Sequence, residues 1–257
     1  MMKSLPRKRV IVSHFLCSLA IVATVLTVVY FLWYPAPYFQ INGAAGVLKT
    51  LIGVDLVLGP ALTVLLYKPG KKGLWFDMLF IGVLQLSALA YGTTVLYQER
   101  PQYMVFAVDR FVVVPGTQLY PSPNMSVPIC EGSWSGPCEV AAVLPDDLQE
   151  REAVLFRSIE QGVELEHQPE YWQLLPTQSA LLLQKAKPLA ELADTTADAQ
   201  RRIARFVGAS GYDVTGLRYL PVVNGRLQAM TVVIDSNDAS RVGVIAIDPW
   251  RAQGEKD

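Results

Sequence analysis

One acidic residue lies inside a long apolar stretch of this chain, where an ionised side chain is unfavourable. Asp55 comes about seven residues after the start of the apolar run 48–67, which places it roughly 10 Å inside a helix. A carboxylate in hydrocarbon costs ~2.5–3.5 kcal/mol, so we expect Asp55 to face protein. Pro60 removes the helical hydrogen bond to the Leu56 carbonyl. A freed carbonyl beside an acid is a candidate proton or ion site.

The residues that follow Asp55 allow a second interpretation of the same face. Gly59 and Thr63 come at i+4 and i+8, and small residues at this spacing let two helices approach closely. Gln85, in the next apolar run, is expected about one turn from the depth of Asp55. Three apolar runs with one acid are too few for a transport path. The following residues therefore form a candidate helix-packing face or a contact face for a partner's helix: Asp55, Gly59, Pro60, Thr63 and Gln85.

Two cysteines outside the apolar runs lie in a segment rich in Gly, Pro and Ser. Cys130 and Cys138 have seven residues between them, and they could serve as metal or redox ligands or form a structural disulfide. The spacing is not C-x-x-C and no matching histidine or cysteine accompanies the pair, so a zinc site is not predicted. We expect a structural disulfide, which requires an oxidising compartment.

The sequence has two histidines and no motif that is typical of a catalytic centre. His14 lies near the start of the first apolar run, and His167 lies near Glu164 and Glu166, where we expect a solvated acidic loop. In the membrane topology argued below, the two histidines lie on opposite sides of the bilayer, so they cannot share a metal ion. The patterns G-x-S-x-G, Walker A, G-x-G-x-x-G and H-E-x-x-H do not occur. We therefore expect no metal, no cofactor and no enzymatic activity.

Three apolar stretches position the candidate face. They cover residues 10–34, 48–67 and 76–97 approximately, and each is long enough to cross a hydrocarbon core of ~30 Å. The first is longer than the apolar part of a signal peptide, and no A-x-A-like site follows it, so we expect a retained helix. The tight turn KPGKKG makes the second and third stretches a helical hairpin. Residues 1–100 are therefore predicted to be a membrane domain.

Basic residues predict the orientation of these helices. Four precede the first stretch and three lie between the second and third, whereas the loop between the first and second holds only Lys49. Lys and Arg collect in cytoplasmic loops, so the N-terminus is expected inside and residues 101–257 outside, as in an inner-membrane anchor with an outward-facing domain. The basic residues concerned are Lys3, Arg7, Lys8, Arg9, Lys68, Lys71 and Lys72.

The outward part is expected to be one α+β domain. It carries thirteen Lys/Arg and twenty Asp/Glu, against nine and three in residues 1–100, and this acidic balance argues against nucleic acid as a partner. Asn224-Gly225 is a strong hairpin signal, so the domain is expected to end in an antiparallel β-meander. Helices are predicted over 145–162 and 189–207, and strands over 103–114, 216–223, 226–235 and 241–247.

Two long segments resemble a known family. Residues 51–78 read LIGVDLVLGPALTVLLYKPGKKGLWFDM and residues 84–114 read LQLSALAYGTTVLYQERPQYMVFAVDRFVVV. They are similar to the type IV pilin accessory proteins of the TfpX/TfpZ type, and the similarity is strongest over about 46–114. Beyond the candidate face, the resemblance covers these motif positions: Lys68, Pro69, Gly70, Lys71, Lys72, Gly73, Asp77, Asp109 and Arg110.

The resemblance implies a multi-pass protein of the bacterial inner membrane with a periplasmic C-terminal domain. It is expected to assist assembly, subunit stability or surface display of a cognate type IV pilin, with inner-membrane assembly components and lipid as further partners. No catalytic residues come with this family. One route is contact with the pilin through the candidate face and by strand addition at an edge of the meander. The alternative is a membrane-anchored periplasmic ligand-binding or sensor protein.

Overall fold

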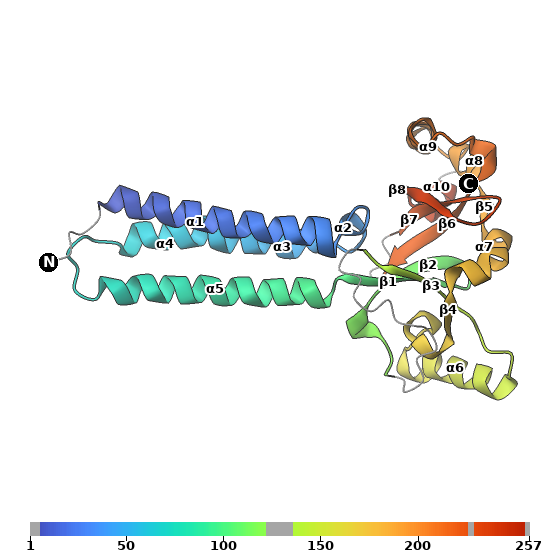
Figure 1. The fold of residues 1–257 in the computed structure, drawn as a ribbon, viewed down its shortest axis with the longest axis horizontal. Coiled ribbons are helices and arrows are strands. Elements are labelled where there is room, and N and C mark those ends of the chain that lie inside the picture. Colours follow the sequence, from blue (N-terminus) through green and yellow to red (C-terminus); the bar gives the residue numbers. More distant parts are fainter. Residues whose placement is uncertain (1–5, 122–135, 226–228, 255–257) are drawn as a thin grey trace. The chain divides into compact units, whose positions relative to one another are not determined.

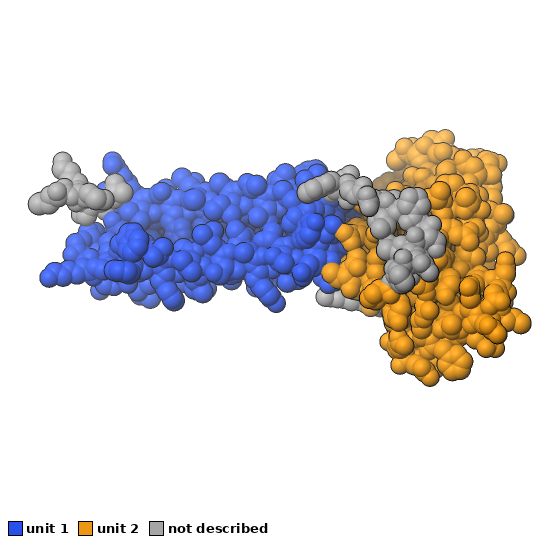
Figure 2. Space-filling view, turned by 60° about the horizontal axis from the view of Figure 1, so that its bottom comes forward, with its two compact units in different colours: residues 1–100 blue, residues 101–257 orange. Residues whose placement is uncertain are grey.

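The structure is a computed structural model that describes residues 6–121, 136–225 and 229–254. The chain divides into two compact units, residues 1–100 and residues 101–257, which are blue and orange in Figure 2. Each unit contains its own buried apolar clusters. Of the cysteine pair, Cys138 begins a strand of the second unit, whereas Cys130 lies outside the described residues. The disulfide therefore stays a prediction.

Unit 1 contains three long apolar helical segments that lie side by side (Figure 1). They are Arg7–Trp33, Ala44–Leu66 and Leu74–Gln98, and each is long and apolar enough to cross a membrane. The three predicted helices are therefore confirmed as candidate membrane spans. Their elements are α1 (Arg7–Val28), η1 (Val29–Trp33), α2 (Tyr38–Ile41), α3 (Ala44–Ile52), η2 (Gly53–Leu58), α4 (Gly59–Leu66) and α5 (Leu74–Gln98).

One apolar cluster holds the three segments together. Val29, Leu48 and Leu96 belong to it, one from each segment, and the Tyr34 hydroxyl donates a hydrogen bond of 2.9 Å to the Leu96 carbonyl. Many large apolar side chains of the same helices, including Phe80, point outward and are exposed. An apolar outer surface around a small interior is what a bilayer requires, because lipid solvates that surface.

Unit 2 is an α+β unit with one mixed sheet (Figure 1). The order of its strands is β4-β3-β1-β2-β6-β7-β8, with β5 paired to β6. The pairs β1–β3 and β2–β6 are parallel and the others are antiparallel. The strands are β1 (Pro101–Ala107), β2 (Arg110–Pro115), β3 (Cys138–Ala142), β4 (Trp172–Leu174), β5 (Lys187–Pro188), β6 (Leu217–Asn224), β7 (Ala229–Asp235) and β8 (Arg241–Ile245).

Helices pack on one face of this sheet in two groups. Val154 of α6 joins the apolar cluster around Val112 and Val223, and Ile203 of α9 joins a second cluster around Tyr219. Tyr219 and Val223 lie four residues apart on β6, so both clusters occupy the same face. The helices are α6 (Leu148–Gln161), α7 (Ser179–Lys185), α8 (Leu189–Ala193), α9 (Ala197–Ser210) and α10 (Pro249–Gly254), with 3₁₀ turns η3 (Gly116–Gln118), η4 (Leu165–His167), η5 (Pro169–Tyr171), η6 (Leu175–Gln178) and η7 (Val214–Gly216).

The single strand predicted over 103–114 is wrong, because this segment is a hairpin. β1 and β2 pair antiparallel, and Val108 and Asp109 form the turn between them. Val108 has φ of 60°, a left-handed conformation that β-branched residues rarely adopt. The turn contains neither Gly nor Asn, so its sequence carries no hairpin signal.

The last three predicted strands are present but form part of a larger sheet. β6 pairs with β7 and β7 with β8, both antiparallel. β6 also pairs in parallel with β2, a contact that local sequence patterns do not predict. The helix predicted over 189–207 is two helices, α8 and α9, and the Thr196 side chain caps α9 by accepting from the Ala199 N–H at 3.1 Å.

An ion pair shows that the sheet is strongly curled. Arg241 Nε of β8 lies 2.9 Å from Glu139 Oε1 of β3, although β1, β2, β6 and β7 separate these strands in the sheet. A flat sheet would hold them roughly 24 Å apart, five strand spacings. Burial raises the pKa of Glu139, and the Arg241 charge acts against that rise.

We predict that Arg241→Gln destabilises the protein more at about pH 7.5 than at about pH 5. Without the guanidinium, the pKa of Glu139 in the folded state rises further, so its ionised form at neutral pH lowers the free energy of unfolding. Protonation at low pH removes that penalty. The partly exposed pair is worth about 1 kcal/mol, measurable by thermal unfolding of the full chain in detergent. The double variant with Glu139→Gln should lose the extra pH dependence, and an equal loss at both pH values in the single variant would contradict this account.

Candidate functional site

The polar residues predicted within the apolar runs lie in the interior of unit 1. Asp55 is 4% exposed, and Thr63 and Gln85 are also buried. The second segment runs from Ala44 to Leu66, so Asp55 is eleven residues from each end. It therefore lies at the middle of the segment, deeper than the roughly 10 Å predicted from the sequence, because the helix begins earlier than its hydropathy indicates.

His14 links these residues across three helices, a role that the sequence analysis missed. Its Nδ1 lies 2.6 Å from Thr63 Oγ1 of α4, and its Nε2 lies 2.8 Å from Gln85 Oε1 of α5. Since Gln85 Oε1 can only accept, Nε2 carries a proton and donates it. The sequence does contain a signal for this role, because a histidine within an apolar run requires a polar partner.

A π-helical stretch changes which carbonyl Pro60 leaves free. The Gly59 N–H donates to the Val54 carbonyl, five residues back, so the carbonyl opposite the missing proline N–H is that of Asp55 and not of Leu56. Gln85 Nε2 of α5 donates to this Asp55 carbonyl at 3.3 Å. The neighbouring helix thus supplies the hydrogen bond that proline removes.

Gly59 is needed for this contact because Gln85 lies directly against it. A Cβ atom at position 59 would come within 2.0 Å of Gln85 Nε2. His14 and the Asp55 carbonyl hold the Gln85 amide in that place. The face predicted from Asp55, Gly59 and Thr63 is thus packed against α1 and α5 inside the unit, and contact between this face and a partner's helix stays a prediction.

Asp55 retains one oxygen without a partner. Its Oδ2 is buried and has no hydrogen bond within the part of the chain that the structure describes. Across those same residues, no group of three His, Cys, Asp or Glu side chains comes together as metal ligands would. The hydrogen bonds that the structure gives this cluster join α1, α4 and α5 and the π-helical stretch to one another.

The basic loop between α4 and α5 is a turn that depends on its glycines. Gly70 and Gly73 have φ of 82° and 81°, which L side chains rarely adopt. Gly73 precedes the first residue of α5, and Lys71 forms an ion pair with Asp77 in the first turn of that helix. This turn accounts for the spacing of the motif at Lys68, Pro69, Gly70, Lys71, Lys72 and Asp77.

The other two motif positions lie at the turn between β1 and β2. Arg110 Nε is 2.8 Å from Asp109 Oδ1, and the guanidinium lies over the Trp250 ring at 5.3 Å from its centroid. Both side chains of the pair are partly exposed, as expected for a surface contact.

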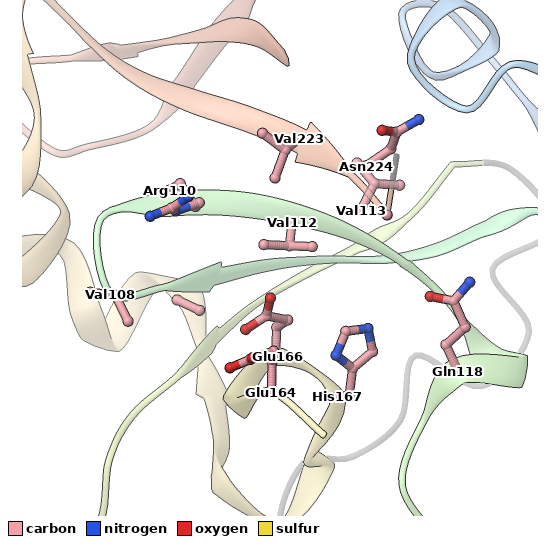
Figure 3. A pocket seen from close by; sticks show the side chains of 12 residues that line it. Val108, Arg110, Val112, Val113, Gln118, Glu164, Glu166, His167, Val223 and Asn224 are labelled. Carbon is pink, nitrogen blue, oxygen red and sulfur yellow. The ribbon is translucent and has the colours of Figure 1, made fainter. Parts of the chain in front are cut away.

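Beside this turn, unit 2 has a cavity of about 450 Å³. Figure 3 shows Glu164, Glu166 and His167 at one side of it, below the strands that carry Val112 and Val223. Gln118 and Asn224 also line the cavity, as do Ala107, Val108, Arg110, Val113 and Gly225.

The 3₁₀ turn η4 that carries these acidic residues is fixed by its neighbours. Leu165 is buried in the apolar cluster under the sheet, and the fully buried Gln168 accepts from Arg157 at 2.8 Å and donates to the Val163 carbonyl at 3.0 Å. The Tyr120 N–H donates to the His167 carbonyl at 2.7 Å. A solvated acidic loop was expected here, and the structure instead has an ordered turn against the sheet.

Known proteins resemble this chain over most of its length. A fimbrial assembly protein of Dichelobacter nodosus, serogroup I, is 29% identical over 229 residues, which are 87% of this chain and 89% of that protein. Another from that organism, serogroups C1 and C2, is 39% identical over 98 residues, 37% of this chain and 75% of the relative. The chain belongs to the fimbrial assembly protein family.

The similarity to this family also covers the N-terminal part of the chain. The family profile described as "Fimbrial assembly protein FimB" matches residues 4–43, the region of the first span and the loop after it. The resemblance described from the sequence is strongest over about 46–114, and the profile adds similarity N-terminal to that region. No solved structure was found to match the chain.

We predict that Gly59→Ala destabilises unit 1 by about 1–2 kcal/mol. The added methyl displaces the Gln85 amide from the Asp55 carbonyl and from His14. Thermal unfolding in detergent would measure the loss.

Gly53→Ala is the matched control in the same segment, because a Cβ atom there meets nothing within 4 Å. Alanine is the better helix former by ~1 kcal/mol, so this control should be neutral or stabilising. Equal effects of the two variants would mean that Gly59 is not a packing contact.

Proposed function

We propose that this chain is a non-enzymatic accessory factor for a type IV fimbrial subunit, of the TfpX/TfpZ type, that assists assembly, subunit stability or surface display from the bacterial inner membrane. The observation that carries the proposal is the 39% identity over 98 residues to a protein named for fimbrial assembly. The three candidate spans support a membrane location.

The distribution of basic residues supports a cytoplasmic N-terminus and a periplasmic unit 2. Arg7, at the start of α1, donates a hydrogen bond to the Val64 carbonyl near the end of α4. Arg7 and the Lys68–Lys72 loop therefore lie at the same end of unit 1. Trp33 and Tyr97, near the other ends of the first and third spans, pack edge to face with centroids 5.2 Å apart. Positive residues at one end and aromatic residues at the other fit the positive-inside rule.

The edges of the sheet are poor sites for strand addition by a subunit. One edge strand, β4, has three residues, and the other, β8, has five and an irregular register opposite Val233 and Ile234. Short and irregular edges disfavour pairing with another chain. Contact by strand addition, which the sequence suggested, is therefore not the mode that we propose.

A better contact surface is the outer face of α6. Val154 is the buried residue of this helix, yet four large apolar side chains on it are 50–82% exposed. They cover the side away from Val154 and make up half of the exposed large apolar residues in the described part of unit 2. We name them the α6 face: Leu148, Leu155, Phe156 and Ile159.

Charge indicates what the α6 face would bind. Glu152 lies on the same stripe, between Leu148 and Leu155 in the helical repeat, and no described residue forms an ion pair with it. A carboxylate amid apolar side chains suits an apolar segment that carries a Lys or Arg. The proposed occupant is such a segment of the fimbrial subunit.

A ligand-binding or sensor protein is the second candidate function. The cavity beside η4 favours it, since ligand sites are concave and typically 300–1,000 Å³. The two functions differ in what loss of the gene does to fimbriae.

We predict that deletion of the gene removes surface fimbriae from a retraction-competent strain. Counting fimbriae by electron microscopy in retraction-competent and retraction-deficient backgrounds tests this. Loss in both backgrounds would mean a role in subunit stability or assembly, and loss only where retraction works would mean a shift between extension and retraction. Normal fimbriation in both would favour the sensor function.

The double variant Leu155→Ser, Ile159→Ser should lower surface fimbriation several-fold while the chain accumulates normally. Both side chains are exposed, so their loss should change the free energy of unfolding by less than ~0.5 kcal/mol each. Gln149→Ser, Gln161→Ser is the control, since it changes two exposed polar positions of the same helix. Equal fimbriation in all three strains would remove the α6 face from the mechanism.

A further inference from the structure

The cavity beside η4 combines apolar walls with an acidic side. Val108, Val112 and Val223 are among its apolar lining residues, and Glu164 and Glu166 are its carboxylates. Its volume of about 450 Å³ exceeds that of a single side chain. Such a site suits a ligand with an aliphatic portion and a polar end.

The negative charge at this side is not neutralised within the described residues. Neither Glu164 nor Glu166 forms an ion pair there, and Glu164 only accepts a hydrogen bond from Ser158 at 2.6 Å. The one cationic lining residue, Arg110, is paired with Asp109 and lies over Trp250. The cavity therefore has an excess of negative charge.

His167 lines the cavity from the same turn as the two carboxylates. Its Nδ1 atom is buried and has no hydrogen-bond partner among the described residues, although backbone hydrogen bonds on both sides of it fix its turn. The ring is therefore held in place at the acidic side of the cavity, where it can report on a bound cation.

We propose that this cavity binds an alkylammonium or guanidinium group, with the charged end at Glu164 and Glu166, beside His167, and the aliphatic part along the valines. Lys and Arg have this combination, since their methylene stems pack on apolar surface while the head is charged. A basic side chain of a protein segment and a free polyamine share this chemistry.

The two histidines of the chain allow a direct test. The full chain in detergent, labelled with ¹⁵N in histidine only, should show signals from His14 and His167 alone, and His167→Asn assigns them. The probes are Nα-acetyl-lysine amide, its neutral norleucine analogue, and spermidine. We expect the lysine probe to shift the His167 signal saturably, the norleucine probe not to shift it, and His14 to stay unchanged.

Spermidine distinguishes the two sources of the cation, because tighter binding of spermidine than of the lysine probe would identify a free polyamine. Glu166→Gln should weaken binding of the cation roughly tenfold. Glu160→Gln, at an exposed carboxylate of α6 outside the cavity, should leave the affinity unchanged. No saturable shift with either cation, an equal shift with norleucine, or equal affinities of the two variants would overturn the proposal.

Discussion

In hydrocarbon, a backbone carbonyl without a donor costs several kcal/mol, because no water can replace the missing partner. Unit 1 meets this constraint at Pro60, where proline and the π-helical stretch leave the Asp55 carbonyl without an N–H. Gln85 of α5 supplies the donor, and it can do so only because residue 59 is glycine. The same amide accepts from His14 of α1. One backbone defect thus accounts for polar contacts among all three apolar segments.

Unit 2 follows a different constraint, since its sheet is buried on both faces. Val112 and Val223 face the helices, and Phe106 and Phe111, on the opposite face, are also buried. The ion pair between Glu139 and Arg241 shows how the second face is enclosed, because the sheet curls until its two ends approach. Most apolar side chains of the strands are thus used in folding. The exposed apolar residues on α6 are not, which is why we assign that face to a partner.

Sequence reasoning predicted elements better than contacts. The three apolar runs and the last three strands follow from hydropathy and β-propensity, which are local properties. The hairpin at Val108 was missed because a valine with φ of 60° is held there by the pairing of its strands, and no local pattern encodes that. The parallel pairing of β2 with β6 joins residues about a hundred positions apart. No local sequence pattern predicts a pairing over that separation.

The same limit applies to the candidate sites. A polar residue stands out in an apolar run of the sequence, so Asp55 and Gln85 could be identified as candidates. The hydrogen bond between His14 and Gln85 depends on how three helices pack, which the sequence does not show. The cavity was missed for a related reason. Glu164, Glu166 and His167 resemble a solvated loop in sequence, and only the burial of Leu165 and Gln168 turns them toward the sheet.

The bond from Gln85 to the Asp55 carbonyl also bears on how the candidate spans would enter a bilayer during synthesis. The second segment is apolar enough to cross a membrane, but its proline, its acid and a carbonyl without a helical donor each make its entry into lipid alone more costly. Its donor lies thirty residues later in the chain, beyond a tight basic turn. The translocon would therefore release the two segments together as a preformed hairpin, and a ribosome stalled before α5 would leave the second segment exposed to rejection and proteolysis.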